Sequence, residues 1–457
     1  MPFATTDAAP FLIDASGYQG AAERVVVPAN AAEVREIVGL CSVRGVPLTV
    51  AGAGTGLTGA RVPHGGWVIS LERFRAVQIA NGRARCGAAV TLAELAVEAA
   101  KTRQFFGPNP TETSASVGGV IATNAGGARS FLYGAVRRHV LTLEVTFVDG
   151  RTVEYKRGDK VDFPVRPIAL PKTTKNAAGY FLQPSLDWVD LLAGSEGTLG
   201  IVTEAELKLF AEPAAILSGV VFFPSDEHAL DAVDAWRPVP ELRLLEYIDD
   251  AGLNLLRPSY PEIPTGASAA ILIEQNLESE DNEEVDLWTD RLEEQGALEQ
   301  SWFGFAASER ERFRQFRHAL PSMIVDRARR NGFPKFATDF AVPIERHREL
   351  HSYYRQRCEE SFPGQHTIFG HAGDANNHVN LIPEDAQQAK RGEELIHEFA
   401  RYTVSLGGTV AAEHGIGKTK TDLLRLMYPS QDIEAMREVK RRLDPQMLLG
   451  RGTIFEV

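Results

Sequence analysis

The sequence predicts an α+β protein of two or three domains, and three observations support this fold class. A strand-helix-strand unit near the N-terminus leads into a glycine-rich loop, Ala51–Ala60. From about Ala214 the glycine-rich loops give way to alternating strands and charged helices, which suggests an antiparallel sheet with helices on one face. The chain of 457 residues is also longer than a single hydrophobic core usually serves.

Residues 1–212 are expected to form the first domain. A hydrophobic run beginning near Arg24 precedes a helix predicted at Ala32–Arg44, and a second run leads into the glycine-rich loop. A third strand is expected at Gly66–Leu71 and a second helix at Thr91–Lys101. Asp149-Gly150 joins two alternating runs, and this dipeptide suits the tight turn of a hairpin.

Residues 213–410 are expected to form a second, cap-like domain, and residues 411–457 a C-terminal segment that returns to the first. The strands of the second domain are predicted at Ser218–Phe223, Leu242–Ile248 and Ala269–Asn276, and its charged helices at Glu283–Gln295 and Ser308–Arg330. One final helical stretch is expected between Glu413 and Arg442.

Composition excludes several classes of function. The 48 Lys and Arg residues against 61 Asp and Glu give a net charge of -13, which repels a nucleic-acid backbone. The three cysteines, Cys41, Cys86 and Cys358, form no CxxC pair, so an iron–sulfur cluster within this chain is not expected. No stretch reaches the length of a membrane span. A cytoplasmic protein is predicted, either free or peripheral to a membrane.

The loop AGAGTGLTGA has glycines at positions 52, 54, 56 and 59. Successive backbone N–H groups in such a loop can form an anion-binding nest for a pyrophosphate. The loop lacks the Lys-Ser or Lys-Thr ending of a nucleotide-hydrolysing P-loop, and its glycine spacing differs from the dinucleotide fingerprint. A plain turn between strands is the alternative. Two later segments, Gly107–Gly127 and Leu191–Glu204, would add backbone donors beside one extended ligand.

His371, His378 and the pair Glu413-His414 are the most informative residues of the chain. Two imidazoles and a carboxylate suit a zinc-like divalent metal with an open position, and the second residue of the pair remains free for proton transfer. In a regular strand His371 and His378 would lie on opposite faces, so Gly373, Asp374 and Asn376 must turn the chain. Loop histidines that bond only to the turn are the alternative.

Five motifs in this order resemble one family, the FAD-linked oxidases that include D-lactate, glycolate and D-2-hydroxyglutarate dehydrogenases. The resemblance spans about Val25 to Phe455, and its motifs are AGAGTGLTG, PNPTETSASVGGVIATNAGG, GSEGTLGIVTEA, GHAGDANNH with EHGIGK, and the terminal LDPQMLLGRG. It implies a two-lobed FAD-binding domain of the vanillyl-alcohol-oxidase type, covered by an antiparallel-sheet cap domain that binds the substrate.

The resemblance also implies the residues that contact FAD. The pyrophosphate is expected on Gly52, Ala53, Gly54, Thr55, Gly56 and Leu57. Contacts to the flavin, ribose or phosphates are expected from Pro108, Thr111, Ser114, Gly118, Gly119 and Asn124. The adenosine and ribityl side is expected on Glu196, Gly200, Ile201 and Val202.

Some members of such families link a histidine covalently to the flavin, but this phosphate loop contains none. His64 lies outside the loop glycines and is expected on the surface, so dissociable FAD is predicted. The chain departs from the family pattern at Ala51, Ala53 and Gly450, which leaves FAD intact as the cofactor. Ala375 stands where a glycine is usual, and it is expected to tighten the loop without removing a ligand.

By the same resemblance, His371, His378 and Glu413 hold the metal, with zinc as the expected ion, and His414 is the base. Asn380 is expected to touch the substrate and Arg317 to bind its carboxylate in a bidentate fashion. Arg314 and Arg327 lie on the same helical stretch as Arg317, so a solvated helix face is the alternative for this arginine.

A monocarboxylate such as D-lactate is the expected substrate. In 2-hydroxyglutarate-type members a lysine stands where this chain has Ala337, although Lys335 lies two residues earlier. A D-2-hydroxyglutarate dehydrogenase, the flavin subunit of a glycolate oxidase and an oxygen-using oxidase remain alternatives. A metallohydrolase would leave the glycine loops unexplained. Electrons are expected to leave through quinone, electron-transfer flavoprotein or an iron–sulfur subunit, and the chain could act as a homodimer.

Overall fold

The N-terminal strand-helix-strand unit forms as the sequence predicts. In the computed structural model, which describes residues 3–108, 110–281 and 283–455, the helix begins one residue earlier than expected, and the Asn30 side chain caps it by accepting from the Glu33 N–H. Helix α1 (Ala31–Arg44) packs beside a sheet of order β1–β2–β4–β3. Its strands are β1 (Ala4–Thr6), β2 (Arg24–Val27), β4 (Trp67–Ser70) and β3 (Leu48–Ala51), of which the last three run parallel.

A five-stranded antiparallel sheet completes the N-terminal domain. Its order is β5 (Val77–Ala80), β6 (Arg83–Gly87), β10 (Ile201–Lys208), β8 (Val140–Thr146) and β9 (Thr152–Lys156). The predicted hairpin joins β8 to β9, and Gly150 has a φ of 83° that its turn requires. This domain also contains α2 (Leu92–Ala100), β7 (Gln104–Phe105), α3 (Val117–Ala122), α4 (Ser130–Tyr133), α5 (Trp188–Leu192) and β11 (Phe210–Ala211).

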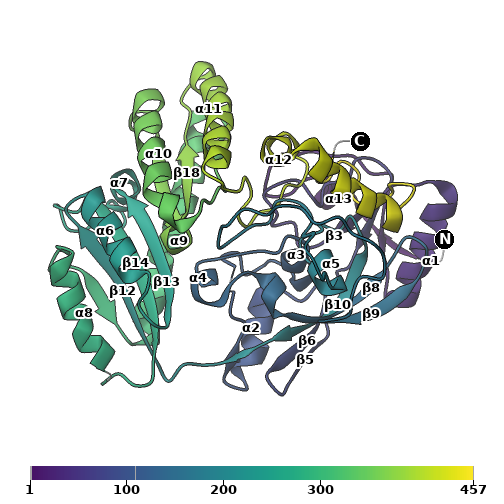
Figure 1. The fold of residues 1–457 in the computed structure, drawn as a ribbon, viewed down its shortest axis with the longest axis horizontal. Helices are drawn as coiled ribbons and strands as arrows, with labels where there is room; N and C mark the ends of the chain where they lie inside the picture. The colour runs from purple at the N-terminus through teal and green to yellow at the C-terminus, as the bar shows by residue number, and fades with distance from the viewer. Residues whose placement is uncertain (1–2, 109, 282, 456–457) are drawn as a thin grey trace.

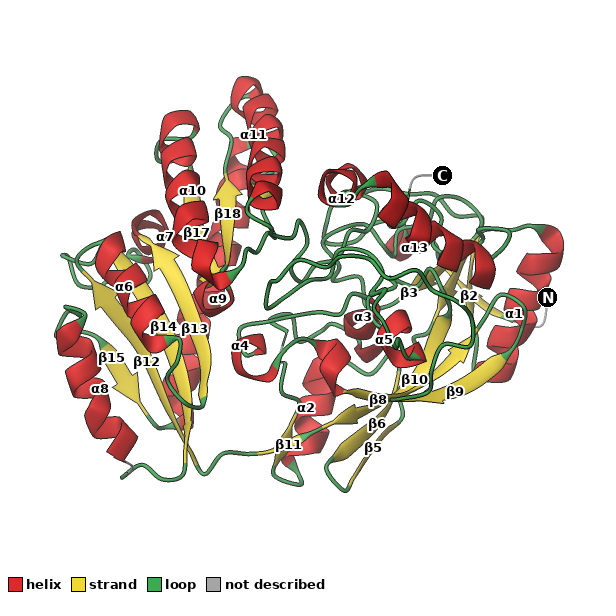
Figure 2. Cartoon of the chain, viewed as in Figure 1, coloured by secondary structure: helices red, strands yellow, loops and turns green. Residues whose placement is uncertain are grey.

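The second domain is built on a seven-stranded antiparallel sheet, seen on the left of Figure 2. Its order is β15 (Trp302–Gly304), β12 (Ala215–Phe223), β14 (Ala269–Leu277), β13 (Leu242–Asp249), β17 (His366–His371), β18 (Asn376–Leu381) and β16 (Phe336–Ala337). Its helices are α6 (Asp226–Trp236), α7 (Asp250–Leu256), α8 (Glu283–Glu294), α9 (Ala307–Asn331), α10 (His347–Ser361) and α11 (Ala386–Ser405).

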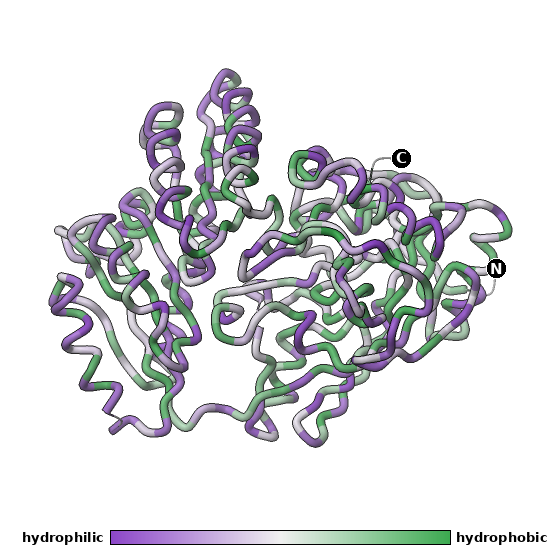
Figure 3. Tube along the Cα trace, in the orientation of Figure 1, coloured by the Kyte–Doolittle hydropathy of each residue, from purple (hydrophilic) through white to green (hydrophobic). Residues whose placement is uncertain are grey.

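Helices cover both faces of this sheet, so the expectation of a single covered face was wrong. Val221 and Phe223 of β12 belong to one apolar cluster with residues of α6, α8, α10 and α11. Phe222 of the same strand lies in another with residues of α7 and α9. Successive strand residues point to opposite faces, and both Val220–Phe223 of β12 and Ala269–Ile273 of β14 are continuous apolar runs. Hydrophobic stretches of this kind are drawn in green in Figure 3. A strand apolar on both faces needs cover on both.

The end of the chain returns to the N-terminal domain. Helices α12 (Thr421–Met427) and α13 (Ser430–Leu443) lie beside that domain in Figure 1. Helix α12 also meets α11 of the second domain, where His397 Nε2 lies 3.3 Å from Asp422 Oδ2. The Leu48 N–H donates to the Leu448 carbonyl at 2.8 Å. The single helical stretch expected here was wrong: Pro429 separates two helices, because proline is disfavoured in a helix interior. The sequence-based domain boundaries stay a prediction.

Candidate active site

A hairpin brings His371 and His378 to the same face of the second sheet. His371 ends β17 opposite Asn376, and His378 of β18 lies opposite Phe369. Residues paired across antiparallel strands point to the same side, so the turn at Ala372–Asp374 overcomes their odd spacing. Ala375 closes that turn with a φ of 52°, a left-handed conformation that costs a residue with a Cβ atom about 1 kcal/mol.

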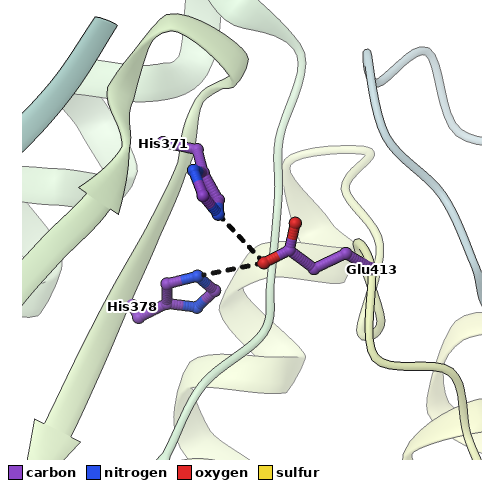
Figure 4. A group of neighbouring side chains, drawn as sticks. All are labelled: His371, His378 and Glu413. Atoms are coloured by element: carbon purple, nitrogen blue, oxygen red, sulfur yellow. Dashed lines mark hydrogen bonds and ion pairs between the residues drawn. The ribbon is translucent and has the colours of Figure 1, made fainter. Parts of the chain in front are cut away.

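Glu413 meets both histidines. Its Oε1 lies 3.0 Å from His371 Nε2 and 3.4 Å from His378 Nε2, as drawn in Figure 4. All three residues are buried. The turn-bonded alternative is wrong, because both imidazoles stand on strands and bond to other segments.

The other ring nitrogen of each imidazole is held by the protein. Nδ1 of His371 donates to the carboxylate of Glu246 on β13, and Nδ1 of His378 donates to the Thr338 carbonyl at 3.0 Å. Each contact leaves Nε2 turned toward Glu413. Histidines that ligate a metal usually have such a hydrogen bond on their other ring nitrogen. The sequence analysis did not identify Glu246, although an acidic residue within the apolar run LRLLEYI was a usable signal.

A buried lysine occupies the far side of Glu413. Lys175 Nζ lies 3.0 Å from Glu413 Oε2 and 3.3 Å from Asp374 Oδ2, and its side chain is 1% exposed. This contact engages Oε2 and leaves Oε1 to face the imidazoles. Nothing in the sequence around Lys175 indicated this role.

The donor set fits a divalent cation. With a hydrogen on each Nδ1, two Nε2 lone pairs and a carboxylate oxygen face one another, an arrangement that repels unless a proton or a metal lies between them. Burial lowers the pKa of His371, but the carboxylates of Glu246 and Glu413 outweigh it and raise that pKa to about 9. The same local charge that favours a proton there favours a metal ion. In the described part of the chain Asp339, Glu413 and His414 form a second such cluster.

His414 lies beside this cluster and is neutral near pH 7. Its Nε2 is 3.7 Å from Glu413 Oε1, its Nδ1 is 3.5 Å from Asp339 Oδ2, and its ring stacks on that of His378. Enclosure by surrounding groups lowers its pKa to about 4, although Asp339 and Glu413 oppose the shift. With 29% of its side chain exposed, His414 is the accessible member and can accept a proton.

Of the three candidate arginines, Arg317 reaches the site. Its Nε donates to Glu246 Oε2 at 3.0 Å, and its guanidinium lies over Phe369. Arg314 pairs with Glu311, and Arg327 donates to the Gly364 carbonyl, both in exposed contacts. The bidentate contact of Arg317 with a substrate stays a prediction.

Asn380 lies on the same sheet face as His378, two residues along β18. Its Oδ1 accepts from Lys335 Nζ at 3.2 Å. Burial lowers the pKa of Lys335. Lys335 therefore supplies a lysine side chain at this end of the site, although Ala337 stands where related proteins have a lysine.

The glycine-rich loop follows β3 and approaches the start of α3. A Cβ on Gly52 would lie 2.7 Å from Ser116 Oγ, so a side chain there would close the gap between the two segments. Gly52, Ala53, Gly56 and Leu57 are exposed, and Gly54 and Thr55 are partly exposed. Gly118 and Gly119 lie in α3, whose N-terminus Ser116 caps. This exposed cradle, with no side chains at its glycines, fits an extended phosphate-containing cofactor.

The other residues expected to contact the cofactor differ from one another in exposure and in their hydrogen bonds. Thr111 and Ser114 are exposed and Pro108 is buried. Asn124 is buried, and its amide bonds the Asn176 carbonyl and the Arg137 N–H. Gly200 precedes β10, and Ile201 and Val202 are its first two residues. The Glu196 carboxylate accepts from the N–H groups of Ile416 and Gly417, so a contact with the cofactor would have to come from its backbone.

His64 is not the surface histidine that the sequence suggested. It is half-buried and bonds through Nε2 to the Tyr18 hydroxyl. Burial lowers its pKa. The position is enclosed because Gly452 lies against the ring, where a Cβ would be 2.7 Å from Nδ1.

Comparison with known proteins identifies FAD-related family models in both halves of the chain. A family model described as FAD binding domain matches residues 22–156, and one described as FAD linked oxidases, C-terminal domain, matches residues 212–454. A D-lactate dehydrogenase of Archaeoglobus fulgidus is 31% identical over 441 residues, covering 94% of this chain and 90% of the relative.

Two further relatives are similar at comparable levels. A probable mitochondrial D-lactate dehydrogenase of Danio rerio is 29% identical and covers 95% of this chain and 84% of its own length. The glycolate oxidase subunit GlcD of Bacillus subtilis is 28% identical and covers 96% and 90%.

The solved structure of an alkyldihydroxyacetonephosphate synthase has a TM-score of 0.67 at 17% identity and covers 94% of this chain and 76% of its own. The expected α+β fold with a vanillyl-alcohol-oxidase-type FAD-binding domain is confirmed. No helix in the described ranges is long and apolar enough to cross a membrane.

Proposed function

Because the chain belongs to the FAD-linked oxidases and is an FAD-dependent oxidoreductase, we propose that it oxidises a D-2-hydroxy acid to the 2-oxo acid with the help of a divalent metal, zinc by preference. The cluster of His371, His378 and Glu413 carries the proposal, since an outer partner holds the second polar atom of each side chain and leaves one ligand atom facing inward. FAD bound on the glycine-rich side would supply the hydride acceptor, its N5.

The side chains of the site have separable tasks in this reaction. His371 Nε2, His378 Nε2 and Glu413 Oε1 would hold the metal, which as a Lewis acid lowers the pKa of the substrate hydroxyl. His414 takes the hydroxyl proton on Nε2, because its Nδ1 faces Asp339 and it is neutral near pH 7. Arg317 and Asn380 would orient the substrate carboxylate, and the hydride leaves the same carbon for FAD.

We propose D-lactate, or a similar small monocarboxylate, as the substrate. Relatives named D-lactate dehydrogenase support this proposal, as does Ala337 in place of a lysine. One observation favours a second candidate, a 2-hydroxy diacid. Lys335 Nζ lies 3.2 Å from Asn380 Oδ1 on β18, the strand that also carries His378, and its ammonium would pair with the distal carboxylate of such a substrate.

Electrons from the reduced flavin need an acceptor. Because the three cysteines are buried and scattered along the chain, we propose that this acceptor is quinone, electron-transfer flavoprotein or a separate iron–sulfur subunit. Stoichiometric peroxide from the aerobic protein would instead identify an oxidase. The cytoplasmic or membrane-peripheral location and the homodimer stay predictions.

The direct test is anaerobic addition of single 2-hydroxy acids to the purified yellow holoenzyme. D-lactate should bleach the visible flavin band, and L-lactate, the matched control, should not. If D-lactate, glycolate and D-2-hydroxyglutarate all leave the band unchanged, the proposed activity is wrong. Bleaching by both enantiomers at equal rates would contradict the D-specificity alone.

A further inference from the structure

Two buried carboxylates from different domains hold the loop that carries Glu413 and His414. Asp339, from the second domain, accepts the N–H of Glu413 at 3.2 Å and that of His414 at 3.0 Å. Glu196, from the N-terminal domain, accepts the N–H groups of Ile416 and Gly417, both at 2.8 Å. Four of the five backbone N–H groups of residues 413–417 therefore point at a carboxylate.

The loop conformation is matched to Glu196. Gly415 has a φ of 78°, and a Cβ at that position would lie 2.9 Å from the Glu196 carboxylate. Glu196 itself has a φ of 52°, a left-handed conformation that a residue with a side chain adopts only when its surroundings impose it. Both sides of the contact are thus shaped for it.

Glu196 is also tied firmly to its own domain. Its N–H donates to the Ala122 carbonyl at 2.8 Å, and the N–H of Gly194 donates to the Ile121 carbonyl at 2.9 Å. Ala122 ends α3, the helix that contains Gly118 and Gly119. One side chain therefore joins the segment proposed to bind FAD to the loop proposed to bind metal and move the proton.

We infer that Glu196 is a positioning residue that fixes the backbone of residues 413–417 and so sets the places of Glu413 and His414. Its carboxylate does not serve the adenosine or ribityl group, since both oxygens bond to these amides and the residue is 6% exposed. This role rests on the proposed function only in its consequence for turnover. The bonds themselves can be tested without substrate.

Glu196→Gln isolates the contact. A glutamine keeps the size of the side chain but offers one acceptor oxygen, so its NH₂ group must face one of the two backbone N–H donors, and that donor is left unsatisfied. Asp187→Asn is the matched control. Asp187 is also a buried carboxylate of the N-terminal domain that accepts from two backbone N–H groups, those of Gly158 and Asp190, away from the 413–417 loop.

Hydrogen exchange of the holoenzymes, read by mass spectrometry, gives the main measurement. In Glu196→Gln the peptide covering residues 413–417 should exchange at least ten times faster than in the wild type, while the ratio of bound FAD to protein stays unchanged. Flavin reduction by the active 2-hydroxy acid should slow at least tenfold. In Asp187→Asn the added exchange should appear near residues 158 and 190 and leave residues 413–417 as in the wild type.

Loss of FAD from Glu196→Gln with unchanged exchange at residues 413–417 would show a cofactor ligand and overturn the inference. Unchanged exchange with FAD retained would overturn it as well. Should the variant fail to fold, the wild-type holoenzyme decides: the amides of Ile416 and Gly417 must be protected like those of Glu413 and His414, and exchange at the rate of open loop amides would contradict the bonds. A wild type inert toward every 2-hydroxy acid would defeat the proposed activity and leave this exchange result standing.

Discussion

Glu246 accepts the Nδ1 hydrogen of His371 and thereby turns Nε2 of that imidazole toward Glu413. The two residues are separated by 125 positions in the sequence and meet because β13 and β17 are neighbours in the second sheet. Arg317 binds the other oxygen of Glu246, so the carboxylate has a fixed orientation. A buried carboxylate thus determines which ring nitrogen of His371 faces Glu413.

Glu246→Gln should weaken metal binding by about 10-fold to 100-fold, the usual effect of removing a partner behind a ligating histidine. FAD content should not change. Metal affinity measured by competition with a chelator checks this. Glu241→Gln, a change in an exposed residue ahead of the same strand, is the control and should behave as the wild type. Equal metal affinity in both variants would show that Glu246 has no part in the site.

His371→Ala and His378→Ala should each abolish turnover and lose the metal while FAD remains bound, because the glycine-rich segments belong to the other domain. Metal analysis and the visible spectrum measure the two cofactors separately. His366→Ala, which removes a buried histidine at the start of the same β17 strand, should keep its metal. Wild-type activity in either site variant after chelator treatment would mean that the metal site is assigned wrongly.

His414→Ala should slow anaerobic flavin reduction by about two to four orders of magnitude, the usual contribution of a positioned base. Its metal content should match the wild type, since Glu413 is the proposed ligand. Stopped-flow absorbance gives the rate. If His414→Ala and Glu413→Ala lose metal equally, the second cluster with Asp339 is part of the metal site.

The pH dependence follows from the same residue. The pKa of His414 is lowered to about 4, and only the neutral imidazole can accept the hydroxyl proton. The rate of flavin reduction should therefore stay level as pH falls past 6.5, where an exposed histidine would titrate, and decline only near pH 4. An acid limb near 6.5 that disappears in His414→Ala would contradict this.

Lys335→Ala separates the two substrate candidates. If the protein prefers a monocarboxylate, kcat/KM for D-lactate should exceed that for D-2-hydroxyglutarate, and the variant should change the D-lactate value little. A buried carboxylate without a partner costs several kcal/mol, so a diacid that uses Lys335 should lose activity strongly in the variant. A preference for 2-hydroxyglutarate that disappears in Lys335→Ala would overturn the monocarboxylate assignment.

Acid or heat denaturation should release FAD into the supernatant, because the phosphate loop has no histidine and the Nε2 atom of His64 is hydrogen-bonded to the Tyr18 hydroxyl. Absorbance of the supernatant and of the washed precipitate measures the partition. Flavin that stays with the precipitated chain would demonstrate a covalent link.

The sequence by itself determined most of the local elements and singled out the residues of the candidate metal site. Caps, turns and apolar runs are local, and for that reason α1 was predicted within one residue and the β8–β9 hairpin at its observed turn. His371, His378 and Glu413 were identifiable as candidate ligands because imidazole and carboxylate groups suit a divalent metal. Motif order was enough for the family and for FAD.

The tertiary structure decided which distant groups complete the site. Lys175 reaches Glu413 over 238 positions, and Glu196 reaches Ile416 over 220, whereas local spacing carries no information on such pairs. The cover on both sheet faces and the place of Lys335 at Asn380 were likewise settled by packing. A buried charge is stable only beside its partner, and the folded chain alone determines which partner that is.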